Sequence, residues 1–439
     1  MTLSRRRFLS TATLGTGALA APWVRAQATS TLTFAFAPDE SGAIQGLIDA
    51  FNAGNGSGIE VIWTQAPENS DDFLDFMRSE FRAGATGIDL FGADVIWTAE
   101  MAARGWLREV PRGLIGDIGR ADLLGPALDT VAWRNRTWAV PWYTDVGLLY
   151  YRRDLLEEAG LSGPPSTWDD LAEAASAVME QSGLPHGLVL QGAQYEGGTT
   201  NALEVIWSAG GRAWTGEASV SLGLGLRPAE DNVIVLDTAD SIAGMAKMRE
   251  LVEAGVIPEA VTTMNERDSL QVFGGGEAVF MRNWPFAYGL LGSGEFGDVT
   301  PDQVGAAPIP TLRPGMTSYS CLGGWNLAVP VTSRDANAAW EFVRFALAPE
   351  QQRAMAETGG FMPVRPSLYE DDDLSAAAPV VALAGPEVLR ARARPSSPFY
   401  ADLSPRLAIM FGRILRGELP ADEAVPGTAR ELRNMIDTI

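Results

Sequence analysis

The chain has 439 residues, a length that allows two or three domains with large cores. Hydrophobic residues make up 46% and charged residues 20%, which is typical of an ordinary globular protein and excludes a disordered or integral membrane chain. The formal net charge of −22 repels phosphate backbones, so nucleic acid is not an expected partner. With one cysteine, Cys321, and one histidine, His186, the chain can form neither an intramolecular disulfide nor a cysteine/histidine zinc cluster.

Residues 1–26 indicate an export signal. Three arginines at 5–7 precede a weakly apolar stretch from Leu9 to Ala21, and the arginine pair followed by Phe8 and Leu9 resembles the twin-arginine signal, which exports folded proteins across a bacterial inner membrane. The stretch is shorter than the roughly 20 residues that a bilayer span needs. Because no cysteine lies near the expected cleavage point, we expect a periplasmic mature protein without a lipid anchor there. A disordered basic tail on a cytosolic protein is the alternative.

Strand and helix patterns alternate from residue 31 to residue 105, which predicts an α/β sheet. The expected elements are a strand over 31–36, a helix with apolar residues at 44, 47, 48 and 51, a strand over 59–63, a helix capped by Asp71 or Asp72, a strand in the run 89–97 that ends at Asp94, and a short helix over 99–104. Ligands on such sheets collect at the carboxyl ends of the strands. Glu40, just beyond the first strand, and Asp94, near the end of the third, lie at this kind of edge.

The rest of the chain predicts a second α/β lobe closely connected to the first. Its expected elements are a helix capped at Thr167, a strand over 187–191 and helices over 202–209 and 242–252. An extended run over 138–152 precedes them. A strand over 278–281, a strand over 327–329, a helix over 340–347 and helical segments after 376 follow them in the chain. The fold class is therefore α/β, with two lobes that each contain a sheet flanked by helices.

The common enzymatic motifs are incomplete or absent in this sequence. The glycine-containing segment 221–228 ends in Pro228 where a dinucleotide fingerprint needs its third glycine, and no Gly-Lys pair exists for a phosphate loop. His186 lies in a predicted turn, and the chain has no nucleophile elbow of a serine hydrolase. We expect the acidic run 370–373 to be a solvated loop. A glycosidase carboxylate pair stays open as an alternative, since any two acids can have the required separation.

The positive signal for function lies in the aromatic residues, which include 13 tryptophans. Several aromatics stand beside polar residues in short irregular segments, namely 142–145, 194–197, 283–285 and 323–326. Sugars present apolar C–H faces and hydroxyl groups, so their sites combine aromatic rings with carboxylates, Arg or Asn. We expect core positions for Trp106, Trp133, Trp168, Trp207 and Trp340. For Trp284 and Trp325, which are flanked by Pro or Gly, we expect a functional position.

Several longer motifs resemble one family. They are Asp94-Val-Ile-Trp-Thr98 with Gly105-Trp-Leu107, Ala139-Val-Pro-Trp-Tyr-Thr-Asp-Val-Gly-Leu-Leu-Tyr-Tyr-Arg152, Gln191-Gly-Ala-Gln-Tyr-Glu-Gly197, Met281-Arg-Asn-Trp-Pro285 and Leu322-Gly-Gly-Trp-Asn326. In this order they resemble the family 1 extracellular solute-binding proteins of ABC importers, and within it the trehalose/maltose-binding branch.

This resemblance implies a periplasmic-binding-protein fold with a multi-strand hinge, a first lobe of residues 29–140 and 308–365, and a second lobe of residues 141–307 and 366–439. It also implies sugar contacts from both lobes and the hinge, which are Glu40, Asp94, Trp142, Tyr143, Asp145, Tyr195, Glu196, Trp284, Tyr288, Gly324, Trp325 and Arg394. Trp284 and Tyr288 would form one stacking wall, and Gly324 with Trp325 the other. Arg365 is the alternative to Arg394.

The resulting hypothesis is a monomeric receptor that binds an α-linked disaccharide by lobe closure and delivers it to the transmembrane subunits of an ABC permease. Trehalose is the first expected ligand, followed by maltose and sucrose. No cofactor, metal or catalysis is expected. A secreted glycoside hydrolase is the rival from another class, and a receptor for charged ligands such as polyamines or glycerophosphodiesters is a third possibility.

Overall fold

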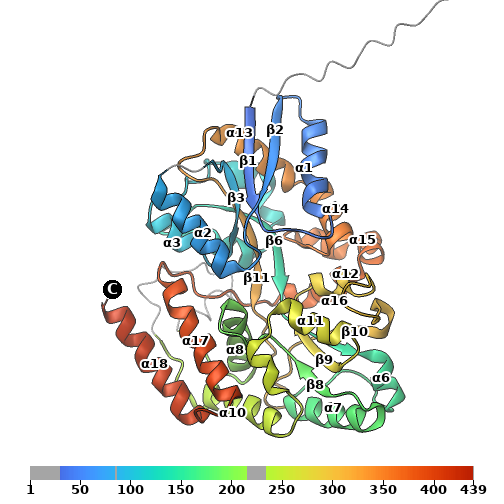
Figure 1. Cartoon of the computed structure of the whole chain (residues 1–439). Helices are drawn as coiled ribbons and strands as arrows, with labels where there is room; N and C mark the ends of the chain where they lie inside the picture. The colour runs from blue at the N-terminus through green and yellow to red at the C-terminus, as the bar shows by residue number, and fades with distance from the viewer. Residues whose placement is uncertain (1–29, 85–86, 215–233, 439) are drawn as a thin grey trace, which may run out of the picture.

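The computed structural model describes residues 30–84, 87–214 and 234–438, and it arranges them in two α/β lobes, one above the other in Figure 1. The predicted signal at 1–26 and the segment 221–228 lie outside the described residues. Within the described residues, no helix combines the length and the apolar character needed to cross a membrane.

In the first lobe the described strands form a six-stranded sheet, called the large sheet below, in the order β12-β6-β11-β3-β1-β2. Its strands are β1 (Ser30–Phe36), β2 (Ile59–Gln65), β3 (Leu90–Asp94), β6 (Val140–Val146), β11 (Leu322–Ala328) and β12 (Met362–Pro363). β1 pairs in parallel with β2 and with β3, as the predicted strand–helix–strand unit requires. β11 pairs antiparallel with β3 and β6, so a segment from late in the chain lies at the centre of this sheet.

Helices and short elements surround the large sheet. They are α1 (Ala43–Gly54), α2 (Ser70–Ala83), α3 (Thr98–Ala103), α4 (Leu114–Ile118), η1 (Arg120–Asp122), α5 (Gly125–Thr130), the hairpin of β4 (Ala132–Trp133) and β5 (Arg136–Thr137), α13 (Ala336–Ala346) and α14 (Pro349–Gly359). The predicted cap of α2 was wrong, because the side chain of Asn69 accepts the backbone N–H groups of Asp71 and Asp72. The Asp71 carboxylate is therefore available for contacts elsewhere.

In the second lobe the described strands form a four-stranded sheet, the small sheet, in the order β10-β7-β9-β8. Its strands are β7 (Leu148–Arg152), β8 (His186–Val189), β9 (Ala278–Asn283) and β10 (Val304–Ala307). The helical elements around it are α6 (Arg153–Glu158), α7 (Trp168–Ser182), α8 (Glu196–Ser208), α10 (Ala239–Glu253), η3 (Glu259–Thr263), α11 (Glu266–Gly274), α12 (Phe286–Leu290), η4 (Pro301–Gln303), α17 (Tyr400–Leu415) and α18 (Ala421–Thr438). η5 (Pro366–Glu370), α15 (Asp372–Ala377) and α16 (Pro379–Val388) lie between the lobes in sequence and, in Figure 1, at the level of their junction.

Three chain segments run side by side where the lobes join. The predicted extended run 138–152 is in fact two strands in different sheets, since β6 ends and β7 begins on either side of Gly147. The Ser320 hydroxyl donates to the Gly147 carbonyl at 2.7 Å, and Arg392 forms backbone hydrogen bonds with Ser320 and Leu322. A side chain at position 147 would meet the Glu204 carboxylate at 2.0 Å, so this crossing requires glycine.

Two element starts differ from the sequence prediction near this junction. β3 ends at Asp94 as expected, because the chain turns there, with the Trp97 N–H donating to the Asp94 carbonyl. α8 begins at Glu196 instead of at residue 202, and β11 begins at Leu322 instead of at residue 327. Glycines at 197, 198, 323 and 324 obscured both starts.

A ring cluster supports the large sheet beneath the junction. The Phe36 ring lies edge-on to Trp142 at 5.0 Å and to Trp325 at 5.1 Å between ring centroids. It reaches them by crossing Gly92 on β3, where an added Cβ would lie 2.2 Å from a ring carbon of Phe36. Gly92 therefore sets how closely the aromatic rings can pack against this strand.

We predict that Gly92→Ala destabilises the protein by about 1–3 kcal/mol, because the new methyl group must displace the Phe36 ring. Gly46→Ala is the matched control, since Gly46 is exposed on α1 and an added Cβ there meets nothing within 4 Å. That change should stabilise the helix by about 0.5–1 kcal/mol. Urea unfolding followed by circular dichroism measures both effects, and equal midpoints for the two variants would contradict the packing argument.

Candidate functional site

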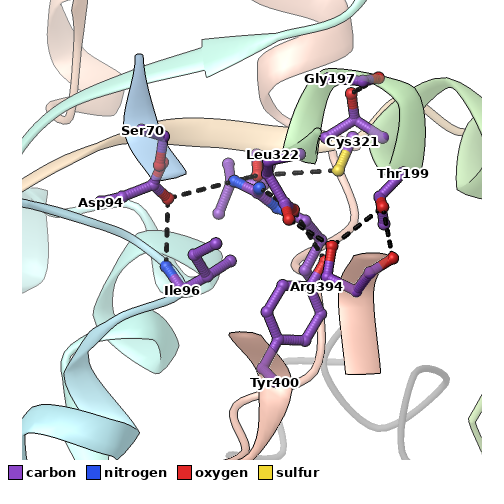
Figure 2. Close-up of polar contacts among 12 residues, drawn as sticks. Ser70, Asp94, Ile96, Gly197, Thr199, Cys321, Leu322, Arg394 and Tyr400 are labelled. Atoms are coloured by element: carbon purple, nitrogen blue, oxygen red, sulfur yellow. Dashed lines mark hydrogen bonds and ion pairs between the residues drawn. The ribbon is translucent and has the colours of Figure 1, made fainter. Parts of the chain in front are cut away.

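Asp94 and Arg394 form the centre of the candidate site. Asp94 ends β3, where its carboxylate accepts the Ile96 N–H at 3.2 Å and the Ser70 hydroxyl at 2.8 Å. A nitrogen of the Arg394 guanidinium lies 3.4 Å from a carboxylate oxygen of Asp94, and both side chains are buried. Figure 2 shows Asp94 and Arg394 pointing toward one another from different segments of the chain.

Glu196, at the first position of α8, brings the second lobe to the same guanidinium. Its carboxylate receives Arg394 at 2.6 Å and the Tyr400 hydroxyl at 2.8 Å, and it also accepts the Ser404 hydroxyl. Burial raises the pKa of Glu196 above its usual value despite the opposing effect of the nearby Arg394. Arg394 therefore pairs with one acid from each lobe, Asp94 from the first and Glu196 from the second.

The Nε–H of Arg394 is buried and has no hydrogen-bond acceptor among the described residues. A buried donor without a partner costs free energy, and an acceptor placed beside it would lower that cost.

Asp71 was not predicted as a site residue, yet it lies at the same place. Its carboxylate accepts the backbone N–H of Glu196 at 3.3 Å, which joins α2 of the first lobe to α8 of the second. Burial raises the pKa of Asp71 more than the hydrogen bond from Glu196 lowers it. The sequence signal was ambiguous, because an acid in the first turn of a helix is also typical of a structural role at the helix N-terminus.

Asp145 lies on β6 opposite Gly323 of β11. An added Cβ at Gly323 would lie 3.1 Å from the Cβ of Asp145 and 3.0 Å from the Trp284 ring, so both side chains flank this glycine. Burial and the nearby carboxylate of Asp94 raise the pKa of Asp145 to about 8, against the weaker opposing effect of Arg282. The site therefore holds two acids that repel one another.

Glu266 is a second residue that the sequence analysis missed. Its carboxylate accepts the Trp284 indole N–H at 3.3 Å and the Tyr195 hydroxyl at 2.5 Å. The Arg282 guanidinium lies 4.0 Å from the centroid of the Trp284 ring and is itself held by Glu204 at 2.6 Å. These contacts fix the orientation of the partly exposed Trp284 ring, which no local motif could have shown.

Trp325 directly follows Gly323 and Gly324 on β11. Its ring stacks on Phe73 at 5.6 Å and meets Trp97 edge-on at 5.2 Å, and it remains partly exposed. Trp325 lies opposite Asp94 in the sheet register. Gly324, next to Trp325, has φ of +111° and approaches the Tyr143 carbonyl so closely that a Cβ there would lie 2.4 Å from the oxygen.

The structure does not bring every predicted residue to this place. Trp142 is fully buried, and its ring packs on Phe34 in the first-lobe core and not beside the acids of the site. Tyr288 has Arg153 and Asp302 as its charged neighbours. Glu40 lies at an exposed position in an ion pair with Arg267.

Two further predictions concern the edge of the site. Tyr143 is buried, with its ring edge-on to Phe361 at 4.8 Å, and burial together with Asp145 and Asp94 raises the pKa of its hydroxyl well above the usual value. It thus borders the acids. Arg365, the alternative to Arg394, bonds the carbonyl of Leu347 and the carboxylate of Asp122 inside the first lobe. Arg394 is the arginine that lies at the junction.

The arrangement suits hydrogen bonding and stacking with a neutral polar molecule. Carboxylates and a guanidinium accept and donate to hydroxyl groups, while the Trp284 and Trp325 rings offer apolar faces. Among the described residues, no group of three or more histidine, cysteine, aspartate or glutamate side chains is arranged to hold a metal ion.

A family model described as bacterial extracellular solute-binding protein matches residues 37–353. The chain belongs to this family. A Deinococcus radiodurans relative, described as a probable ABC transporter-binding protein, is 31% identical over 338 residues, which are 75% of this chain and 74% of that one. The resemblance to ABC-importer solute-binding proteins inferred from the short motifs is therefore confirmed.

Two solved structures support the same conclusion. T. maritima MalE3 with bound maltose is 33% identical with a TM-score of 0.82, covering 92% of this solute-binding protein and 100% of that chain. The GacH receptor of Streptomyces glaucescens, at 23% identity, has a TM-score of 0.80 over 93% and 98% of the two chains and shows the fold. The predicted two-lobed periplasmic-binding-protein fold is thus confirmed.

We predict that Asp145 makes the stability of this solute-binding protein pH-dependent. The folded-state pKa of about 8 lies above the ordinary 3.8, so the folded protein binds more protons than the unfolded chain between these values. The contribution of Asp145 to stability therefore falls as the pH rises from about 4 to about 8.

The measurement compares urea unfolding of the wild type and Asp145→Asn at several pH values between 5 and 8. The variant, which cannot ionise at this position, should gain stability relative to the wild type as the pH rises. Parallel curves for the two proteins would show that Asp145 does not retain its proton in the folded state.

Proposed function

We propose that this solute-binding protein captures an α-linked disaccharide, with trehalose as the first candidate and maltose and sucrose next, for uptake by an ABC permease. The observation that carries the proposal is the convergence of acids from both lobes on one buried arginine, Arg394, beside two partly exposed indoles, Trp284 and Trp325. A disaccharide offers one sugar ring for each indole, and its hydroxyls can bond the acids and the Arg394 guanidinium.

The relatives support a carbohydrate ligand. The T. maritima MalE3 structure contains maltose, and a 25% identical Pseudomonas aeruginosa relative is described as a mannitol-binding protein. These two ligands differ in size, so they support the sugar class more strongly than a particular sugar. Our preference for an α-linked disaccharide rests on the resemblance of the motifs and on the two separate rings.

Lobe closure would provide the affinity. Asp94 belongs to the large sheet, and Glu196 begins a helix that packs with the small sheet's lobe, so one ligand that bonds both acids stabilises the closed state. We propose the lobe bounds 29–140 with 308–365 and 141–307 with 366–439, with the first crossing moved to Gly147 because β6 pairs within the large sheet.

The family is extracellular, and we further propose that a twin-arginine-type signal within residues 1–26 delivers the protein to the periplasm as a monomer without a lipid anchor. Replacing Arg5, Arg6 and Arg7 by lysine should leave the chain in the cytosol when expressed in a bacterium with a twin-arginine pathway. Cell fractionation with detection of the precursor tests this, and unchanged export would contradict the assignment.

We predict that trehalose binds with a Kd below about 1 mM in isothermal titration calorimetry, and that Trp325→Ala weakens binding by about 1–3 kcal/mol through loss of a stacking face. Trp133→Ala is the matched control, because Trp133 lies in the β4–β5 hairpin beneath Arg134, at 4.5 Å from its ring centroid. The control should bind like the wild type. If neither trehalose, maltose nor sucrose binds, the ligand class is wrong.

The glycosidase alternative has its own test. We predict that the purified protein, incubated with trehalose or maltose, releases no glucose in an enzyme-coupled assay, because binding by closure leaves the sugar intact. Glucose production that disappears in an Asp145→Asn variant would instead establish hydrolysis by a carboxylate at this site.

A further inference from the structure

Arg267 connects the two lobes outside the group of residues that we expect to contact the sugar. It lies at the second position of α11, which packs against β9 of the small sheet. One guanidinium nitrogen donates to both carboxylate oxygens of Glu40, at 3.0 and 3.1 Å, and lies 3.6 Å from Glu68. Glu40 follows β1 and Glu68 precedes α2, so both acids belong to the lobe of the large sheet.

Contacts within the second lobe position the Arg267 side chain for this interaction. The other guanidinium nitrogen donates to Glu295 at 2.7 Å, and the guanidinium carbon lies 5.1 Å from the centroid of the Phe296 ring. The segment carrying both residues is anchored to α11, since an added Cβ at Gly297 would lie 2.3 Å from the Gly274 carbonyl. The side chain therefore loses less conformational freedom when the first-lobe acids approach.

Local helix energetics do not explain an arginine at this position. A cation in the first turn of a helix faces the positive end of the helix dipole, so acids are preferred there. α11 otherwise follows that preference, with Glu266 before Arg267 and Asp268 after it. The three surrounding glutamates offset the unfavourable position, and two of them come from the opposite lobe.

We propose that Arg267, with Glu40 and Glu68, forms an ion-pair latch that stabilises the closed state and so sets the lifetime of the bound ligand without touching it. The inference rests on lobe closure as the mode of capture proposed above. It also replaces the predicted role of Glu40, since both oxygens of that carboxylate are engaged by Arg267.

The latch differs from the buried bridge at Arg394 in its response to salt. The side chains of Arg267, Glu40 and Glu68 are 36%, 45% and 61% exposed, so mobile ions can screen them. Ion pairs at such positions stabilise weakly one by one, and the latch therefore adjusts the closed population instead of creating the closed state. Because the ligand enters while the lobes are open and the latch forms as they close, its effect on binding should appear mainly in the dissociation rate.

The experiment compares wild type, Arg267→Gln and Glu40→Gln for trehalose binding by stopped-flow fluorescence at low salt and in 1 M NaCl. At low salt each variant should raise the dissociation rate, and with it Kd, by roughly two- to tenfold, while the association rate changes little. In 1 M NaCl the difference from the wild type should largely disappear.

Two controls separate the latch from a general loss of charge. Arg136→Gln removes an exposed guanidinium whose partner Glu109, at 3.1 Å, lies in the same lobe, and it should leave the dissociation rate unchanged. Glu295→Gln removes an acid from Arg267's own lobe and should change the rate less than Glu40→Gln does. An effect of Arg267→Gln on association alone, or one that persists in 1 M NaCl, would overturn the proposal.

Small-angle X-ray scattering without ligand keeps the test independent of the sugar. Arg267→Gln should give a larger radius of gyration than the wild type at low salt, and the wild type should expand toward the variant's value in 1 M NaCl. Identical scattering of the two proteins under both conditions would overturn the latch. If no disaccharide binds the wild type but this scattering difference is found, the proposed ligand fails while the latch stands.

Discussion

The structure depends on one buried guanidinium. Arg394 lies between Asp94, which ends a strand of the large sheet, and Glu196, which begins a helix of the other lobe. Each acid alone would be a buried, unpaired charge, and removing one partner from such a group typically costs several kcal/mol. The arginine makes it possible for both acids to occupy the junction. The pairing also leaves one of its donors unused among the described residues, which favours a ligand with oxygen acceptors.

The junction is built so that the acids can meet. β6 and β7 continue one another through Gly147, and β11 returns between β3 and β6 to place Gly323, Gly324 and Trp325 beside the acids. Two of these glycines are required sterically, because a side chain at 147 or 324 would overlap neighbouring atoms. The buried ion pair of Glu204 and Arg282 supports both features, since Glu204 also accepts the Cys321 N–H at 2.9 Å. Hinge and site therefore share their supporting contacts.

The sequence predicted the fold well because period and capping signals are local. The helical face of α1 and the capping box at Thr167 were both readable without knowledge of the rest of the chain. The errors arose at positions where tertiary contacts, and not local sequence, determine the structure. Nothing local shows that the chain changes sheet at Gly147, and glycines hid the first turn of α8. Trp133, which we expected in the core, lies instead in a surface hairpin beneath Arg134.

The predictions of site residues also succeeded or failed according to whether a motif or a distant contact determines the position. Asp94, Glu196 and Arg394 were named from motif resemblance, and the structure brings the three together although 300 positions separate Asp94 from Arg394 in the sequence. Trp142 belongs to the same motif as Asp145, but alternation along β6 and packing on Phe34 place its ring in the core. Asp71 and Glu266 were missed because their partners, the Glu196 N–H and the side chains of Tyr195 and Trp284, come from distant segments.

A crystal structure with trehalose tests the central claim most directly. The account predicts a sugar enclosed between the lobes, with hydroxyls bonded to Asp94 and Glu196, an oxygen accepting from Arg394, and pyranose faces against Trp284 and Trp325. Density for the sugar at a place that contacts a single lobe, with Arg394 and both tryptophans untouched, would contradict it.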